Sequence, residues 1–457
     1  MSRTEWLALA AGAILVLGGV AARAEQGSEN AETSQSDAER MKDLERRVGE
    51  LEQAQAERSA APAGPAWLPE WTQRVRLSGS ASVGYFHRGD LTPEEDSAFE
   101  VWDARLFVDA ELAEHVQIGG ATAVRNIGAT VEWNLVREGE LQNDVGELYA
   151  DFQGIADSSW LGAQVGRFLI PVGEAYLRYS KGYRDNPFIS QPVGGPWWWD
   201  EGVRLYGQDP TGRFGYVASV SNGDTKFNVD DNNDPQGTLK LYTDPWPWLH
   251  LSVSGLVSGE IGHKSRPAPG ALWLGETWAM PVGAFTDVPN FINGVPTPDG
   301  PNQIQRTWLV GADAIAKPLD GLRVWLGGGR YDMDASNAVP GPYDRTLYYW
   351  IAEVVADGQL VSPALEPVYL ALRASGLTTG DNGRGYLLHE AYLDTAGYNM
   401  RDLNEYSVAL GWRIGRYVRL RGEYGYRDVN LVRKVDPAIR AQVDDDDWFA
   451  FDVGISF

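Results

Sequence analysis

The last nine residues of this chain, 449–457, alternate strictly between two kinds of side chain. Aromatic and aliphatic residues occupy the odd positions from 449, and small or acidic residues occupy the even positions from 450. Successive side chains of a β-strand point to opposite faces. The pattern therefore predicts a strand with one apolar and one polar face.

The same alternation recurs upstream, with charged residues on the polar face. In the segment 99–112, Trp102 and Leu106 share the expected apolar face, whereas Asp103 and Arg105 occupy the other. A dry sandwich core cannot hold so many charges without a large desolvation cost. They are natural where one face of a strand meets water and the other meets lipid, so the pattern predicts a transmembrane β-barrel.

Sixteen segments show this alternation, and most reach the roughly 9–11 residues that a tilted transmembrane strand needs. An even number of strands places both chain ends on the same side of the membrane. The segments lie near residues 74–86, 99–112, 115–126, 145–153, 160–168, 201–208, 213–221, 237–243, 248–259, 305–317, 321–331, 345–356, 367–374, 404–414, 417–427 and 447–457.

The lengths of the connectors alternate as well. Short periplasmic turns and long extracellular loops are typical of bacterial outer-membrane barrels. We therefore predict an all-β fold, a 16-stranded antiparallel transmembrane barrel over residues 74–457, with Phe457 as the terminal assembly signal. Short connectors are expected at 113–114, 209–212, 244–247, 318–320 and 415–416, and long ones at 87–98, 127–144, 169–200, 222–236, 260–304, 332–344, 375–403 and 428–446.

Residues 1–24 read as a secretory signal peptide. Arg3 precedes an apolar run that is too short for a membrane span, and Ala22 and Ala24 frame a cleavage site. We expect the mature chain in the outer membrane of a Gram-negative cell, with its N-terminal segment in the periplasm.

Residues 25–60 form a polar segment that contains a short heptad seam. Met41, Leu44, Val48 and Leu51 repeat at spacings of three and four residues, which predicts a periplasmic coiled-coil helix. A single solvated helix is the alternative, because only about two heptads are visible. Residues 61–73, rich in proline and alanine, read as a linker.

Composition narrows the class of protein further. The chain has no cysteine, so disulfides cannot hold it, but it has 52 glycines, 18 tryptophans and 20 tyrosines. Removal of residues 1–24, which carry a formal charge of +1, would take the net charge from −24 to −25. Such an acidic chain is not expected to bind nucleic acid.

Six short motifs stand out in the barrel region. They are Asp103-Ala-Arg-Leu106, Gly146-Glu-Leu-Tyr-Ala-Asp-Phe152, Val165-Gly-Arg-Phe-Leu-Ile-Pro-Val-Gly173, Gly202-Val-Arg-Leu-Tyr-Gly207, Ser221-Asn-Gly-Asp224 and Glu366-Pro-Val-Tyr-Leu-Ala-Leu-Arg373. These motifs resemble the phosphate-selective porin O and P family, whose members are trimeric outer-membrane channels. The resemblance implies a homotrimer in outer-membrane lipid that passes ions or small hydrophilic solutes. Phosphate-selective members carry a ladder of arginines and a lysine-rich funnel, and neither can be assigned to residues of this chain, so phosphate selectivity is not expected.

Charged residues on the polar faces of the strands are candidates for the pore lining. A cationic wall opposed by acids would screen solutes by charge. The alternative is that these groups solvate the lumen and pair with one another. The expected positions are Arg74, Arg76, Arg105, Arg125, Arg204, Arg323, Arg373, Arg413, Arg419, Arg421 and Arg427, with Asp103, Glu147, Asp151 and Glu423.

The connector 169–200 is the third long loop, and in porins of this architecture that loop folds inward and narrows the pore. Its tryptophans, 197–199, would either stack on planar solutes or pack the loop against the wall. The expected constriction residues are Glu174, Arg178, Lys181, Arg184 and Asp185.

Together these features predict a passive diffusion channel with charge-based selectivity. No catalytic triad, zinc spacing or haem-attachment motif is visible, so we expect neither an enzyme nor a cofactor. The acidic stretch 228–237 has proline where a calcium loop needs glycine, so no metal site is expected. Two alternatives remain open. The barrel could be a structural tether that contacts the cell wall or an inner partner through its periplasmic coiled coil, or a sleeve that houses the cytochrome of an electron-conduit complex.

Overall fold

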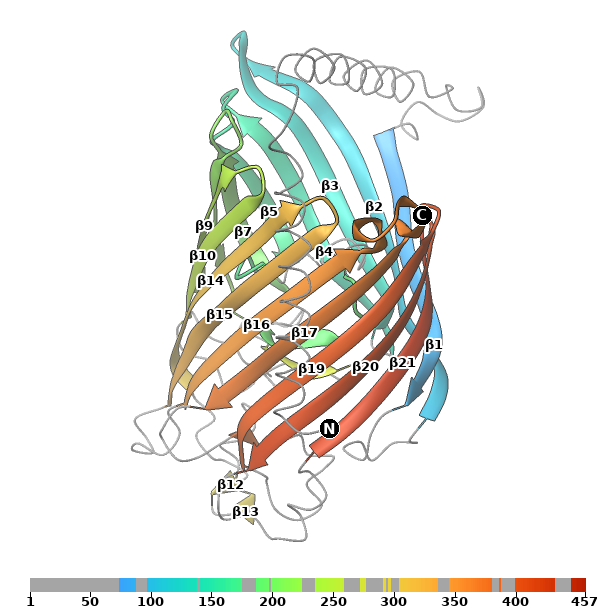
Figure 1. Ribbon diagram of the computed structural model, residues 1–457. Helices are drawn as coiled ribbons and strands as arrows, with labels where there is room; N and C mark the ends of the chain where they lie inside the picture. Colours follow the sequence, from blue (N-terminus) through green and yellow to red (C-terminus); the bar gives the residue numbers. More distant parts are fainter. Residues whose placement is uncertain are drawn as a thin grey trace, which may run out of the picture. The chain divides into compact units, whose positions relative to one another are not determined.

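The computed structural model shows a closed antiparallel β-barrel (Figure 1). It describes residues 74–87, 97–137, 140–174, 186–196, 199–223, 235–258, 272–276, 291–292, 295–296, 304–335, 345–379, 386–387, 399–431 and 445–457. The signal peptide, the seam of the coiled coil and the linker lie outside these residues, so they stay predictions. Within the described ranges, no helix has the length and apolarity needed to cross a membrane.

Among the described residues, sixteen long strands form the wall, each paired antiparallel with its neighbour, and the last pairs with the first. This confirms the fold expected from the alternation. The wall strands are β1 (Val75–His87), β2 (Ser97–Ile118), β3 (Ala121–Arg137), β4 (Glu140–Ile155), β5 (Gly162–Leu169), β7 (Trp199–Gln208), β8 (Phe214–Ser221), β9 (Gln236–Trp246), β10 (Leu249–Ser258), β14 (Ile304–Leu319), β15 (Leu322–Ala335), β16 (Arg345–Asp357), β17 (Val368–Thr379), β19 (Asn399–Ile414), β20 (Val418–Leu431) and β21 (Asp445–Ser456).

Shorter elements lie in the connectors. Two 3-10 turns, η4 (Gly358–Leu360) and η5 (Pro363–Leu365), join β16 to β17. The remaining strands are β6 (Gln191–Pro196), β11 (Leu272–Glu276), β12 (Phe291–Ile292), β13 (Val295–Pro296) and β18 (Tyr386–Leu387).

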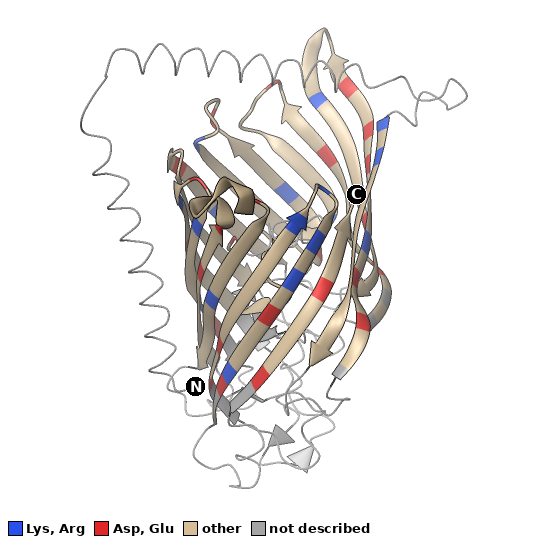
Figure 2. Ribbon diagram, turned by 45° about the vertical axis from the view of Figure 1, so that its right-hand side comes forward, with Lys and Arg blue, Asp and Glu red and all other residues tan. Residues whose placement is uncertain are grey.

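Burial in the barrel is the reverse of that in a soluble protein. The apolar side chains of Val253 and Phe451 are 54% and 50% exposed, whereas Glu132 and Asp452 are 0% exposed. Figure 2 shows acidic and basic residues at many levels of the barrel strands. Because the exposed outer face is apolar and the enclosed face is charged, the barrel suits lipid outside and water inside.

Aromatic side chains form clusters on the outer face near both ends of the wall. Near the short turns, the Trp246 and Trp248 rings stack with centroids 5.5 Å apart. Near the long connectors, Tyr85 lies 5.1 Å from Phe99 and 5.9 Å from Phe449, measured between ring centroids. Such aromatic girdles mark the two interfaces of a membrane.

One long connector expected from the sequence is absent. In place of a loop at 127–144, β3 runs to Arg137 and β4 begins at Glu140. Their ladder shifts register between Val131 and Trp133 and again between Asn134 and Val136. Each irregularity interrupts the alternation of apolar and polar residues. The sequence pattern therefore did not show that both strands continue through this region.

The turn before β3 also differs from expectation. Residues 113–114 lie within β2, and the reversal falls at Gly119 and Gly120, whose φ angles are 62° and 85°. A two-residue hairpin turn of this kind needs positive φ at both positions, which favours glycine. The other expected connectors lie within a few residues of those observed.

Trp102 lies on the opposite face from the one expected. The β1–β2 ladder pairs Ser82 with Asp103 but Val83 with Val101, so Trp102 is the extra residue of a β-bulge. Its side chain is therefore inside the barrel, 2% exposed, with its ring 4.9 Å from that of Phe86. A bulge moves every later side chain of an alternating pattern by one position.

Substitution on the outer face tests the assignment of lipid and water. Val253→Arg places a charge against lipid near the middle of β10, and we expect a loss of about 2–4 kcal/mol in the free energy of unfolding. Val253→Leu, which stays apolar, is the control and should change it little. Equal stabilities of the two variants, measured by urea titration in lipid vesicles, would contradict the assignment.

Candidate functional site

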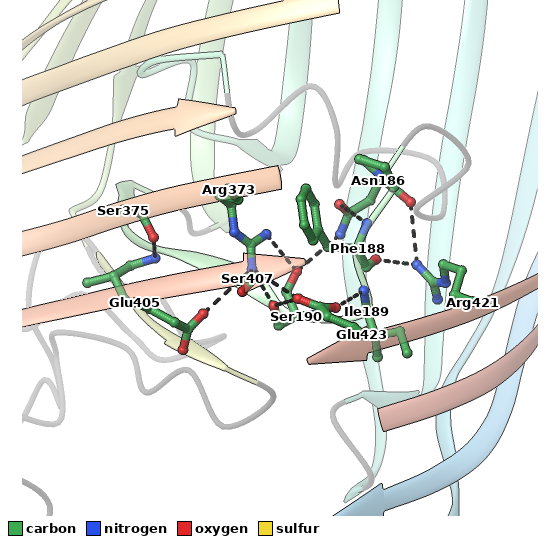
Figure 3. Close-up of polar contacts among 12 residues, drawn as sticks. Asn186, Phe188, Ile189, Ser190, Arg373, Ser375, Glu405, Ser407, Arg421 and Glu423 are labelled. Carbon is green, nitrogen blue, oxygen red and sulfur yellow. Dashed lines mark hydrogen bonds and ion pairs between the residues drawn. The ribbon is translucent and has the colours of Figure 1, made fainter. Parts of the chain in front are cut away.

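A segment of the connector between β5 and β7, residues 170–198, is docked inside the barrel. Phe188, Ser190 and Val193 are fully buried, and β6 lies against β16, β17 and β19. β6 also pairs with β11, which comes from the connector between β10 and β14. We call residues 186–193 the docked segment. Its contacts with the wall are drawn in Figure 3.

Glu423, on β20, holds the middle of the docked segment. Its carboxylate accepts hydrogen bonds from the backbone N–H groups of Ile189, at 2.5 Å, and Ser190, at 3.0 Å. It also accepts the Ser190 hydroxyl at 2.6 Å. Three donors on a fully buried carboxylate replace the water that the charge would otherwise need.

Arg373, on β17, binds the same part of the segment from the other side. It donates to the Ser190 carbonyl oxygen at 3.1 Å and also to the Ser190 hydroxyl. Its guanidinium lies over the Phe188 ring, 4.3 Å from the centroid. Its Nη2 lies 3.5 Å from Glu423 and 3.6 Å from Glu405 (Figure 3), so the buried charges compensate one another.

Arg421, on β20, caps backbone carbonyl groups of the segment. It donates to the carbonyls of Phe188 and, at 3.4 Å, of Asn186, while Asp452 of β21 accepts from its Nε at 2.9 Å. Arg419 also donates to the Asn186 carbonyl, at 3.0 Å. Because Arg421 is buried and paired with Asp452, its charge contributes less to the field met by a passing solute than the charge of Arg419, which is only partly buried.

Two more side chains complete the clamp. The Tyr369 hydroxyl donates to the Pro187 carbonyl at 2.9 Å, and the Ser375 hydroxyl accepts from the Val193 N–H at 2.9 Å. With Arg373, Glu423 and Arg421, these contacts satisfy backbone groups of the segment that the barrel would otherwise leave buried without partners.

The start of the connector that follows β5 is held separately, by Glu174. The carboxylate lies 2.7 Å from Lys240 Nζ and 2.9 Å from His250 Nε2. Burial alone raises the pKa of Glu174, but the hydrogen bond from His250 and the charge of Lys240 outweigh it and lower the pKa to about 2. The charged carboxylate therefore fixes this end of the connector to β9 and β10.

Lys240 and His250 were not among the residues expected from the sequence. Lys240 Nζ also donates to the Gly173 carbonyl at 2.8 Å, and His250 Nδ1 lies 2.7 Å from Asp244. Lys240 stands between Leu239 and Leu241, so the alternation marks it as facing inward, like the arginines.

Several of the expected pore arginines are buried in ion pairs. Arg105 lies 2.7 Å from Asp103 and 3.2 Å from Glu132, and Arg427 lies 3.4 Å from Glu405. These pairs compensate charge within the wall. Glu147, also expected in the lining, is buried beside Glu132, whose carboxylate accepts its backbone N–H.

Other expected arginines stay accessible from the lumen. The side chains of Arg125 and Arg413 are 43% and 46% exposed, beside Asp157 and Asp357 respectively. Arg323 is 3.7 Å from Glu353, and Arg204 donates to Gln164 at 2.7 Å. Arg74 and Arg76 are exposed at the start of β1.

Part of the expected constriction lies outside the described residues, namely Arg178, Lys181, Arg184 and Asp185, together with two of the three tryptophans. Their roles stay predictions. The third tryptophan, Trp199, is buried at the start of β7.

Hollows remain in the lumen beside the docked segment. Two neighbouring hollows, of about 240 and 290 Å³, share Arg413 and Arg419 in their linings. A larger one, of about 610 Å³, lies along the wall from β3 to β9 and includes Arg125, Arg204 and Asp151.

Solved structures with the same architecture include three outer-membrane proteins. OprB of Pseudomonas putida superposes with a TM-score of 0.51 at 13% identity, covering 84% of this chain and 95% of its own. This chain has the porin fold. The outer membrane channel DcaP of Acinetobacter baumannii (TM-score 0.50, 13% identity) and OmpT, an outer membrane protein of Vibrio cholerae (0.52, 11%), each cover 84% of this chain and 97% of their own. No protein-family model and no curated protein matches the sequence.

Removal of the Glu423 carboxylate tests the clamp within this porin fold. Glu423→Ala leaves two buried N–H groups without an acceptor, each worth roughly 1.5–3 kcal/mol when bonded to a charge. We expect the amides of Ile189 and Ser190 to exchange hydrogen at least about tenfold faster, as measured by mass spectrometry. Asp357→Ala, which removes a partly exposed carboxylate that does not bond these amides, is the control and should leave their exchange unchanged.

The anchor at Glu174 predicts a dependence on pH. Its carboxylate has an ordinary pKa of 4.5, so the low folded-state pKa stabilises the folded chain fully above about pH 4.5. This stabilisation, on the order of 3 kcal/mol, is lost as the pH falls from about 4.5 towards 2. Glu174→Gln should lose less thermal stability than the wild type over that range. If Tm, measured in detergent, falls equally with pH in the wild type and in Glu174→Gln, Glu174 does not anchor the connector as described.

Proposed function

We propose that this chain is an outer-membrane porin, a passive diffusion channel for ions and small hydrophilic solutes. The observation that carries the proposal is a closed barrel with an apolar outer face and a charged inner face. The barrel still contains hollows, two beside the docked segment and a larger one along the wall from β3 to β9. Diffusion through such a lumen needs no energy coupling, no cofactor and no covalent chemistry.

Charge-based selectivity follows from a division among the lumen arginines. Arg105, Arg373, Arg421 and Arg427 are buried beside carboxylates. The accessible group, Arg125, Arg204, Arg323, Arg413 and Arg419, is less buried and lines the hollows. Arg421 borders one of these hollows too, but Asp452 compensates its charge. A charge exposed in a water-filled lumen acts on passing ions, so this second group sets the selectivity.

A homotrimer is part of the same proposal. It rests on the resemblance to trimeric channels and on the heptad seam from Met41 to Leu51. The periplasmic position of that seam, and the role of Phe457 as the assembly signal, belong to the proposal too. The backbone of Phe457 closes the ladder with Gly79, through N–H to O contacts of 3.0 and 3.1 Å.

Planar-bilayer recording of the purified chain tests the channel. Ohmic current steps of constant size support it, and a folded chain that inserts without conducting would exclude it.

Selectivity is tested in the same bilayers under a salt gradient. The double variant Arg413→Gln and Arg419→Gln removes two lumen cations, so the reversal potential should move towards that of a cation-selective pore. Arg330→Gln is the matched control, because Arg330 lies on the outer face, 5.0 Å from the Trp308 ring centroid. A reversal potential that is unchanged in the double variant would discard the role of these arginines.

A further inference from the structure

The hollow of about 610 Å³ differs in chemistry from the other two. Its volume falls within the roughly 300–1,000 Å³ of small-molecule sites in proteins. Among the described residues, the side chains that clamp the docked segment lie elsewhere. The lining includes Arg125, Asn126, Tyr149, Asp151, Gln153, Gln164, Arg204, Tyr206, Gln208 and Tyr242.

Two tyrosine rings in this lining are held flat against the wall. Tyr206 stands opposite Gly162 in the β5–β7 ladder, and Tyr242 stands opposite Gly215 in the β8–β9 ladder. A side chain at either glycine would collide with the facing ring. Each ring therefore covers a glycine of the neighbouring strand, and both tyrosines contribute to the lining of the hollow.

His250 helps to fix the second ring. Its imidazole stacks on Tyr242 with ring centroids 5.9 Å apart and an angle of 29° between the planes. Because His250 is itself held by Glu174 and Asp244, both the imidazole and Gly215 restrict the movement of the Tyr242 ring.

Polar groups around the rings provide both donors and acceptors. Asp151 accepts the Tyr206 hydroxyl at 2.6 Å and the Gln153 side-chain amide at 2.8 Å. A carboxylate has about four acceptor positions, so Asp151 can accept further bonds from a ligand. The amide side chains in the lining can donate as well as accept.

Formal charge in this hollow is balanced. Arg125 and Arg204 are matched by Glu147 and Asp151, all four of which contribute to the lining. The hollow around Arg323, Arg413 and Arg419 holds Lys317 as well, against Asp320 and Asp357, so it carries a net positive charge. A balanced site gains little from a net charge on its ligand.

We propose that the hollow beside Tyr206 and Tyr242 is a binding site for an uncharged polyhydroxylated solute, namely a sugar, on its way through the barrel. The C–H face of a sugar ring packs on an aromatic face, and its hydroxyl groups exchange hydrogen bonds with amides and carboxylates. This inference rests on the proposed channel function and names one class of solute for it.

The test uses the full chain in planar bilayers, with glucose and maltotriose as probes. Each sugar should reduce the ion current in a concentration-dependent way. Tyr206→Ala or Tyr242→Ala should raise the half-blocking concentration about fivefold, as expected for one aromatic contact. Tyr206→Phe and Tyr242→Phe keep the rings and should retain most of the block. Tyr417→Ala, which removes a tyrosine from a different hollow, is the control and should not change it.

The possible outcomes separate the site from the channel. Normal current steps without any block by sugar overturn the sugar site and leave the channel standing. If sugar blocks the wild type and the alanine variants equally, the sugar site is overturned. It is also overturned if inorganic phosphate blocks the current and neither sugar does. The current without sugar shows that each variant has folded. Absence of current steps from the wild type would instead count against the proposed function.

Discussion

The closure of the sheet is the constraint on which the rest of this structure depends. Lipid offers no hydrogen-bond partners, so a strand can cross it only if both of its edges are paired. β21 meets β1 from Ser80 opposite Ser456 to His87 opposite Phe449, which removes the last free edges of the wall. Closure encloses one face of every strand, and alternation then sends polar side chains inward and apolar ones outward. The charged interior is therefore a consequence of the pairing.

That interior gives the same residue types two different uses. Arg421 and Glu423 bind backbone atoms of the docked segment, and their charges are compensated by Asp452 and Arg373. Arg413, although it faces Asp357, keeps nearly half of its side chain open to solvent. Burial and pairing, rather than position on the inner face alone, decide whether a charge positions a loop or acts on a solute. The inner wall thus has two groups of charged residues: one group holds the docked segment in place, and the other is exposed to solutes in the lumen.

Alternation along the sequence could predict the strand segments and the inward direction of residues such as Arg421. It could not predict the partners of Glu423, because Ser190 is 233 residues away and the contact exists only once the barrel has closed. It also failed where a bulge shifts the pattern, as at Trp102 and along the β3–β4 ladder. Bulges depend on how two strands pair, which one strand's sequence does not contain.

The abundance of glycine and aromatic residues has a common structural explanation inside the lumen. Tyr369 stands opposite Gly411, Tyr349 opposite Gly329, and Trp448 opposite Gly425, just as the two tyrosines of the larger hollow stand opposite glycines. In each pair, a side chain on the glycine would collide with the ring. A ring that covers a neighbouring glycine protects that part of the sheet and extends along the wall instead of across the bore. Large rings can therefore face inward without filling the barrel. Tyr369 and Trp448 are buried in the same clusters as Phe188 and Ile189, so they give the docked segment an apolar surface on which to pack.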